Sequence, residues 1–449
     1  MSSDAETMDD DASFYSKNLH RECSTILDLP PSCMEFVPVD RTNHCLQHSD
    51  HHQYFVVGTY HLQDSTLDAP ETTSEDTEDT EDGTPPTSKP QKRDGSLNLF
   101  RIQDKQLTLV RRLPFPAGIL DLHFIRHSYG GRSIFVVASS VGTISFFDLE
   151  RQPPEGSSED VPFADYTMGF IHLATHQICP ADRLVLSITW VPTNHISEVP
   201  MLLATLNTGE VHLFQFPDEN FAAFSIANEG LPLVTHGGET WTSAVCPTLE
   251  HVYSGGDDIK LEMVEVNLGE INKDPTAEIR IDKSSYRVRG HEAGITAILP
   301  LPFSDARVFL TGSYDDHIRA YSVTPTGQAK LISDLNLGGG VWRLRFLDEH
   351  SLRESTEFPG AWRVLASCMH GGARIVEIRH ESEDSWAINV IAWVKEHKSM
   401  SYASDVQPLT ESRSEEGVVG GNSERLCVST SFYDKLLVVW SYNPTIDAL

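Results

Sequence analysis

The chain is poor in basic residues. Its 449 residues include 34 Lys and Arg against 65 Asp and Glu, which gives a formal net charge of −31. Residues 64–82 contribute nine acids and no base. Nucleic-acid phosphates and anionic membrane surfaces both attract clustered Lys and Arg, so this composition excludes both as partners.

The sequence also lacks long apolar runs and paired cysteines. No stretch of about 18 apolar residues occurs, so we expect no transmembrane span. Residues 1–12 are acidic and polar, unlike a secretory or transit peptide. The seven cysteines include no C-x-x-C pair, which favours free thiols in a reducing compartment over disulfides or a zinc site. We therefore expect a cytoplasmic protein without a metal or cofactor.

No segment shows a sustained helical period, and the apolar residues alternate in short stretches typical of β-strands. Pairs of such stretches, joined by a turn, repeat along the chain, and the clearest copy runs from Phe309 to Tyr321. The other copies are Tyr54–Tyr60 with Leu97–Phe100, Val136–Asp148, Leu203–Phe214, Val252–Ile259, Leu365–Val376 and Val428–Trp440. A unit that repeats in this way cannot bury its faces alone, so the units must pack on one another.

A further strand precedes each later hairpin. These strands are Ile119–Phe124, Leu184–Trp190, Trp241–Cys246, Ile295–Leu299, Val341–Phe346 and Tyr402–Val406. Seven copies of a multi-stranded unit predict an all-β fold, a seven-bladed β-propeller. Gly290-His291 followed by Asp315 matches the WD repeat, but the Trp-Asp dipeptide never occurs, and the repeats are therefore degenerate.

Acidic, Pro- and Thr-rich segments interrupt the pattern. We expect a disordered acidic N-terminus over residues 1–12 and one propeller over 13–449. Within the propeller, we expect residues 63–95 to form a disordered insert in the first blade and 409–424 a flexible loop in the last.

The general enzyme motifs are absent: there is no G-x-S-x-G, H-E-x-x-H, Walker loop or G-x-G-x-x-G. Gly338–Gly340 precedes a strand and is interpreted as a turn between blades rather than a phosphate cradle. His44, His48, His51 and His52 have no acidic or Cys partner spaced with them, so a solvated loop is favoured over a metal site.

The propeller geometry itself suggests a site. The turns after the second strand of each blade share one face, and aligning the hairpins places one polar or hydroxylated residue of each blade there. These residues are Ser140, Asn207, Asp257, Tyr314, His370 and Tyr433. Such a ring suits either a peptide-binding surface or a small acid–base site. The acids that follow, Asp258, Asp315 and Asp434, are expected to cap their turns.

As an ordered set, several motifs between residues 239 and 440 resemble one WD-repeat family, the diphthine methyl ester hydrolases of diphthamide biosynthesis, also labelled diphthine methyltransferases. The motifs are Glu239-Thr240-Trp241, Tyr253-Ser254-Gly255-Gly256-Asp257-Asp258, Thr311–His317, Gly339-Gly340-Val341-Trp342-Arg343, Cys368–Gly372 and Ser431-Phe432-Tyr433-Asp434. The resemblance implies hydrolysis of a methyl ester on a modified histidine of elongation factor 2.

The implied substrate carries a permanent trimethylammonium group, which aromatic rings and carboxylates can hold. We expect substrate binding by residues of these types on the turn face: Trp241, Tyr314, Trp342, Tyr433 and Asn207. Trp241 and Trp342 could instead be ordinary packing residues between blades. An acidic protein would also associate readily with a basic domain of elongation factor 2.

For catalysis, we expect His370 to act as general base, oriented by Asp257 or Asp405. Cys368 is an alternative nucleophile, although a buried thiol would be inert, and Ser313 or Ser431 also remain open. The competing function is a non-catalytic adaptor that recruits a protein partner. We expect a monomer in either case.

Overall fold

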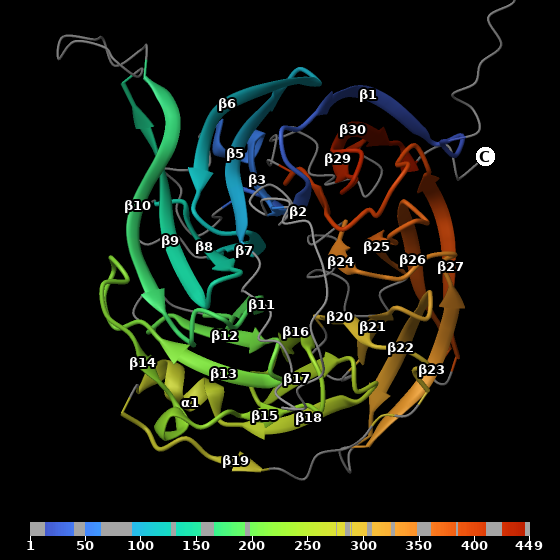
Figure 1. Cartoon of the computed structure of the whole chain (residues 1–449). Helices are drawn as coiled ribbons and strands as arrows, with labels where there is room; N and C mark the ends of the chain where they lie inside the picture. The colour runs from blue at the N-terminus through green and yellow to red at the C-terminus, as the bar shows by residue number, and fades with distance from the viewer. Residues whose placement is uncertain are drawn as a thin grey trace, which may run out of the picture.

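The computed structural model describes residues 14–39, 50–63, 92–126, 132–153, 166–193, 198–274, 276–282, 288, 290–302, 308–324, 328–347, 361–382, 385–409 and 424–444. These residues form seven antiparallel sheets set around one central axis, which confirms the predicted seven-bladed β-propeller (Figure 1). The innermost strands of successive blades contact one another in turn, and the last contacts the first, so the ring is closed.

Each blade is numbered here by its order along the chain, with its strands given from the centre outward. Blade 1 contains β2 (Pro31–Phe36), β3 (Tyr54–Thr59), β5 (Arg93–Gln103) and β6 (Gln106–Phe115), with the short β4 (His61–Leu62) paired to β5. Blade 2 contains β7 (Ile119–Phe124), β8 (Ile134–Ser139), β9 (Thr143–Gln152) and β10 (Thr167–Gln177). Blade 3 contains β11 (Val185–Trp190), β12 (Met201–Leu206) and β13 (Glu210–Gln215), edged by β14 (Ser225–Ile226) and β15 (Val234–Thr235).

The second half of the ring repeats this plan. Blade 4 contains β16 (Thr240–Val245), β17 (His251–Gly256), β18 (Leu261–Val266) and β19 (Ile281–Asp282). Blade 5 contains β20 (Ile295–Pro300), β21 (Val308–Ser313), β22 (His317–Val323) and β23 (Ala329–Asn336). Blade 6 contains β24 (Arg343–Phe346), β25 (Ala361–Ser367), β26 (Ala373–Ser382) and β27 (Ser385–Val394). Blade 7 contains β28 (Ser404–Val406), β29 (Arg425–Thr430), β30 (Leu436–Tyr442) and β1 (Leu19–Ile26).

Blade 7 is completed by the two ends of the described chain. β1 pairs antiparallel with β30, from Leu19 opposite Tyr442 to Ile26 opposite Leu436 (Figure 1). The sequence did not predict this pairing. Its hydrogen bonds lie within blade 7 and join the first strand to the last hairpin, so the chain itself closes the ring.

The predicted first hairpin also forms across its acidic insert. β3 pairs with β5 from Tyr54 opposite Arg101 to Gly58 opposite Leu97, although residues 64–91 separate the two strands in sequence. The expected insert over 63–95 lies outside the described residues except for its ends, where β5 already begins at Arg93. Residues 1–12 and nearly all of 409–424 also lie outside them.

One connection within blade 4 contains a short helix. α1 (Leu268–Lys273) follows β18. Leu268 and Ile271 are buried against blade 4, so packing stabilises a helix that is too short to persist alone. Within the described residues, no helix is long and apolar enough to cross a membrane.

The turn acids have the structural role expected from sequence. Asp258 accepts bonds from His236 Nδ1 (3.0 Å) and the Gly237 amide (3.0 Å), and Asp315 accepts one from the Glu292 amide (2.8 Å). Asp434 accepts one from the Lys398 amide (3.2 Å). Each carboxylate thus joins a turn to the connection before its blade. These bonds hold the turns of blades 4, 5 and 7 in place.

Candidate functional site

The turns that follow the second strand of each blade lie on one face, called the turn face below. They comprise residues 140–142, 207–209, 257–260, 314–316, 368–372 and 431–435 of blades 2–7. Asp257 and Tyr314 directly follow their strands, as the sequence alignment assumed. His370 and Tyr433 stand two positions later, because their turns are longer.

A continuous run of aromatic side chains crosses the turn face from blade 4 to blade 7. This aromatic arc consists of Trp241, Tyr314, Trp342, Tyr402, Phe432 and Tyr433. The Trp342 ring is central to it, with centroids 5.4 Å from Trp241, 5.8 Å from Tyr314 and 5.0 Å from Tyr402. The three rings are tilted against Trp342, so their faces and edges meet as aromatic pairs prefer.

Two acids stand at the blade 4 end of the aromatic arc. The Trp241 Nε1–H donates to Asp257 Oδ1 over 2.6 Å, and the Asp257 amide donates to the Glu239 carbonyl over 2.9 Å. Burial and the neighbouring charge of Asp257 raise the pKa of the Glu239 carboxyl. The structure thus brings two of the expected residues together, Trp241 with Asp257, and adds Glu239 beside them.

His370 lies exposed on the same face, in the turn of blade 6. Its neighbour Met369 forms a backbone bridge with Ser401, the residue before Tyr402 of the arc. A Cβ on Gly340 would come within 2.7 Å of Met369 Sδ and 3.5 Å of Tyr314 Cα, so this glycine allows the turns of blades 5 and 6 to approach. The close approach brings the blade 6 turn, which carries His370, near the blade 5 turn, which carries Tyr314.

The three side chains considered as nucleophiles from the sequence are buried. Cys368 has no exposed surface, and burial raises the pKa of its thiol to about 12. Ser313 is equally buried and donates to the Ala293 carbonyl over 3.0 Å. Ser431 is also without exposed surface. A nucleophile must reach the substrate, so these positions favour packing and turn-capping roles over catalysis.

Two further expected residues have structural partners. The Asn207 side-chain oxygen accepts the Leu184 amide (2.9 Å), within the connection before its own blade. Asp405 is buried in β28, where Oδ2 accepts the Phe36 amide (2.8 Å), and burial raises the pKa of its carboxyl to about 6. None of the contacts described for Asp405 involves His370, so the structure does not bring the two together.

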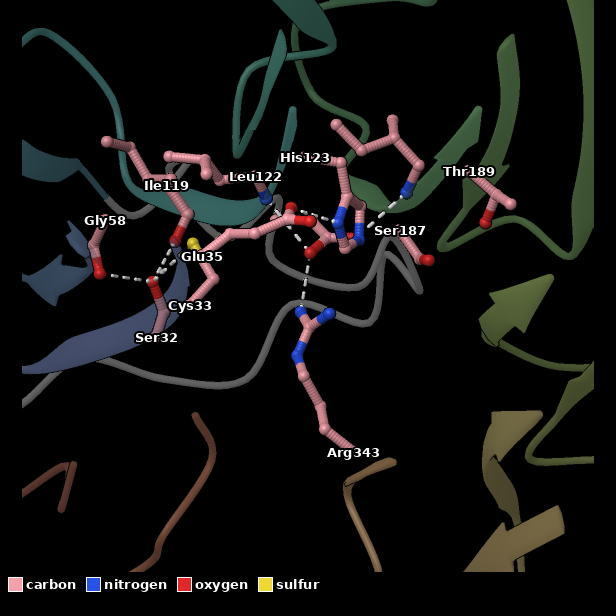
Figure 2. Close-up of polar contacts among 12 residues, drawn as sticks. Ser32, Cys33, Glu35, Gly58, Ile119, Leu122, His123, Ser187, Thr189 and Arg343 are labelled. Carbon is pink, nitrogen blue, oxygen red and sulfur yellow. Dashed lines mark hydrogen bonds and ion pairs between the residues drawn. The ribbon is translucent and has the colours of Figure 1, made fainter. Parts of the chain in front are cut away.

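Inside the ring of blades, charged side chains reach the centre from opposite sides (Figure 2). This channel cluster consists of Glu35, Asp121, His123, Arg343 and Arg345. Figure 2 labels Glu35, His123 and Arg343 among them. Arg343 Nη2 of blade 6 donates to Asp121 Oδ1 of blade 2 over 2.6 Å. Asp121 also accepts the Ile188 amide of blade 3 (2.9 Å), so one carboxylate connects three blades.

His123 lies between two carboxylates of the channel cluster. Its Nδ1 is 2.8 Å from Glu35 Oε2 and its Nε2 is 3.4 Å from Asp121 Oδ2. Burial alone would lower the pKa of His123, but the two carboxylates together raise it. For the Asp121 carboxyl group, burial would raise the pKa, but the charges of Arg343 and His123 hold that pKa well below its usual range. Arg345 Nη2 also lies 3.1 Å from His123 Nδ1, so the imidazole is enclosed by charged neighbours.

A cavity of about 320 Å³ connects these features. Its lining includes Trp241 and Trp342 of the aromatic arc and Arg343, Arg345 and His123 of the channel cluster. The aromatic arc therefore stands at one mouth of the channel, and the charged cluster lies on its wall. In the described part of the chain, no group of three His, Cys, Asp or Glu residues is arranged to hold a metal.

Sequence reasoning missed Tyr402, Glu239 and the channel cluster. Tyr402 stands shortly before the innermost strand of its blade, as Trp342 does in blade 6, so aligning these positions would have found it. Arg343 and Arg345 alternate on an innermost strand, and charged residues with this spacing point toward the propeller axis. The sequence therefore indicated that the two arginines point toward the axis. It did not indicate which residues they contact, because Asp121 lies 222 residues from Arg343.

Relatives of the chain carry one name. A protein named diphthine methyltransferase homolog from Dictyostelium discoideum is 22% identical over 79% of this chain and 89% of its own length. Diphthine methyltransferase of Mus musculus is 26% identical over 71% of this chain, and that of Schizosaccharomyces pombe 30% over 46%. The chain spans 60% and 52% of these two relatives, respectively.

No protein-family model matches the chain. A chain of the solved structure titled "Crystal Structure of Mitotic Checkpoint Complex" aligns with 85% of this one and 99% of itself, at a TM-score of 0.49 and 12% identity. Five curated relatives share the name and a large part of the chain, and the structure is the propeller that this resemblance implied. The chain is thus similar, in sequence over a large part of its length, to the proteins named diphthine methyltransferase.

Proposed function

We propose that this chain acts in diphthamide biosynthesis by hydrolysing the methyl ester of diphthine on elongation factor 2. The names of the relatives support the pathway, because each contains the word diphthine. The observation that carries the proposal is the aromatic arc with Asp257 and Glu239 at one end of it. Aromatic faces and carboxylates together suit a quaternary ammonium group, which diphthine carries and ordinary side chains lack.

In this mechanism, Trp241, Tyr314 and Trp342 hold the trimethylammonium group. Asp257 accepts the Trp241 indole N–H, so it fixes the ring and adds negative charge beside the bound cation. Each desolvated cation–π contact contributes up to about 2 kcal/mol, so two or three rings can localise the substrate. The ester then lies at the channel mouth.

His370 is the proposed base. Its neutral imidazole takes a proton from water as the water oxygen attacks the ester carbonyl, and it returns that proton to the departing methoxide. The products are the free acid and methanol, so the reaction needs no cofactor. Such a base contributes roughly a 10²–10⁴-fold rate increase, which sets the expected loss in a variant.

The test uses ester-bearing elongation factor 2 and purified variants of this chain. We expect His370→Ala to reduce the hydrolysis rate at least about 100-fold. We expect Asp257→Asn to raise KM, because it removes the charge beside the cation. His172→Ala and Asp104→Asn are matched controls, since both residues are exposed and lie on or beside outer strands. Full activity of both site variants would refute this assignment.

A non-catalytic adaptor is the second candidate, and one observation favours it. Tyr433 is 70% exposed and Ile259 is 46% exposed, and both lie on the turn face. Exposed apolar groups on one face suit docking of a protein partner. An adaptor would bind elongation factor 2 stoichiometrically, and His370→Ala would then leave both the binding and the ester unchanged.

A further inference from the structure

The channel wall below the aromatic arc is rich in basic side chains. Arg126, Arg343, Arg345 and His123 line the cavity together with Glu35. Asp121 joins them through its bond to Arg343. Three arginines thus lie near the carboxylates of Glu35 and Asp121, in a chain whose net charge is −31.

Asp405 is a further carboxyl group near this cluster. It is buried in β28, with Arg345 and Glu35 close enough to affect its ionisation. Burial and the like charge of Glu35 raise its pKa to about 6. Clustered arginine side chains in an acidic protein suit an anionic ligand.

Arg343 has capacity for such a ligand. In the contacts described for this side chain, only Nη2 bonds to Asp121. Nε is buried without an acceptor among the described residues, and 19% of the side chain remains exposed. A guanidinium carries five N–H donors, so the Asp121 contact leaves most of them unused.

Trp342 and Arg343 are adjacent in sequence, and both line the same cavity. Trp342 is the central ring of the aromatic arc, whereas Arg343 is the first residue of β24 on the channel wall. A site for a quaternary ammonium group therefore lies directly beside a site for an oxygen anion. The two groups of one small ligand could occupy them together.

We propose that Arg343 is a substrate-positioning residue that binds the carboxyl end of the ligand whose trimethylammonium group lies on Trp342. This inference deepens the proposed function and rests on it for the identity of the substrate. Arg343 contacts the carbonyl oxygen of the ester, and it contacts the full carboxylate after hydrolysis. The site therefore recognises a quaternary ammonium group and a carboxyl group close together on one ligand.

The charge of the ligand changes during the reaction, and the proposed contact changes with it. An ionic hydrogen bond is roughly twice as strong as a neutral one. The acid product is thus expected to bind about tenfold more tightly than the methyl ester, and to inhibit the enzyme. The retained product would leave only when elongation factor 2 dissociates from the turn face.

The test uses small probes on the full chain, with binding followed by ligand-observed NMR. Glycine betaine carries both groups, betaine methyl ester lacks the charge on the carboxyl, and tetramethylammonium lacks the carboxyl altogether. The variants are Arg343→Lys, which keeps a cation for Asp121, and Arg343→Gln. Arg379→Gln is the matched control, because Arg379 is exposed on an outer strand. Circular dichroism checks that each variant is folded.

We expect both Arg343 variants to weaken betaine binding about tenfold while tetramethylammonium binding stays unchanged. Equal betaine binding by wild type and Arg343→Lys would overturn the inference. If Arg343→Gln fails to fold, the lysine variant and a crystal soaked with betaine decide the matter. Arg343-dependent betaine binding without ester hydrolysis would refute the proposed function but keep the anion site. Ester hydrolysis combined with betaine binding that does not depend on Arg343 would keep the proposed function but refute the anion site.

Discussion

Replacing Asp405 with asparagine should stabilise the protein above neutral pH. The carboxyl is buried in β28, and its Oδ2 accepts the Phe36 amide, a bond that an asparagine oxygen can also accept. Burial raises its pKa from 3.8 to about 6. A carboxyl whose pKa is raised by folding favours the folded state below its unfolded pKa, and this contribution is lost as the pH rises through the folded pKa.

The size of the effect follows from that shift. A difference of about two pKa units corresponds to about 3 kcal/mol once the pH is well above 6. At pH 4.5 only about 1 kcal/mol of that cost has appeared, because this pH lies less than one unit above the unfolded pKa of 3.8. Asp405→Asn should therefore exceed the wild type in stability by about 3 kcal/mol at pH 8, and by about 1 kcal/mol at pH 4.5.

Urea unfolding at both pH values measures this difference. Asp148→Asn is the matched control, because Asp148 is also buried but pairs with Arg132 (2.7 Å) and accepts the Ser133 amide (3.0 Å). That variant should lose stability instead. If Asp405→Asn were less stable than the wild type at pH 8, the charged carboxylate would be needed in the folded protein. Loss of ester hydrolysis at unchanged stability would instead support the catalytic role expected from sequence.

Three further variants test other parts of the structure. Trp342→Ala should raise KM about tenfold, because it removes a cation–π contact with the substrate. Trp393→Ala, on the outer strand β27, is the control and should leave KM unchanged. Equal KM values for the two variants would show that Trp342 does not bind the substrate. Cys368→Ala should turn over substrate at the wild-type rate, because the thiol is buried and its pKa is about 12. Lost turnover in a rate assay would instead support Cys368 as the nucleophile. Asp121→Ala should cost about 3–5 kcal/mol in urea unfolding, because it leaves Arg343 without its carboxylate partner and removes one of the two carboxylates beside His123. An unchanged midpoint would contradict that.

The fold could be predicted from sequence because each blade carries its own local pattern. Six innermost strands were found within one or two residues, and all seven hairpins were located, although several of their strands extend three or more residues beyond the predicted bounds. Alternation and turn residues identify these elements without any distant contact. The pairing of β1 with β30 was not predicted. It joins residues more than 400 positions apart, and the sequence of β1 does not indicate which strand lies beside it.

The residues of the candidate site that lie in or beside turns could be predicted from the sequence. Trp241, Asp257, Tyr314 and His370 were placed on the turn face by counting from strand ends. The channel cluster was not, because each of its contacts joins different blades, as in the Arg343–Asp121 pair. Asp405 was assigned to catalysis by residue type, whereas its burial and its bond to Phe36 depend on how blade 7 meets blade 1.

The intact mass of elongation factor 2 tests the central claim most directly. The factor carrying the diphthine methyl ester is incubated with the purified chain, with and without a methyl donor. The account predicts that the factor loses the mass of one methylene group, and that this loss needs neither donor nor cofactor. A gain of the same mass that requires the donor would show a methyltransferase, as the relatives are named, and would contradict the proposed hydrolysis.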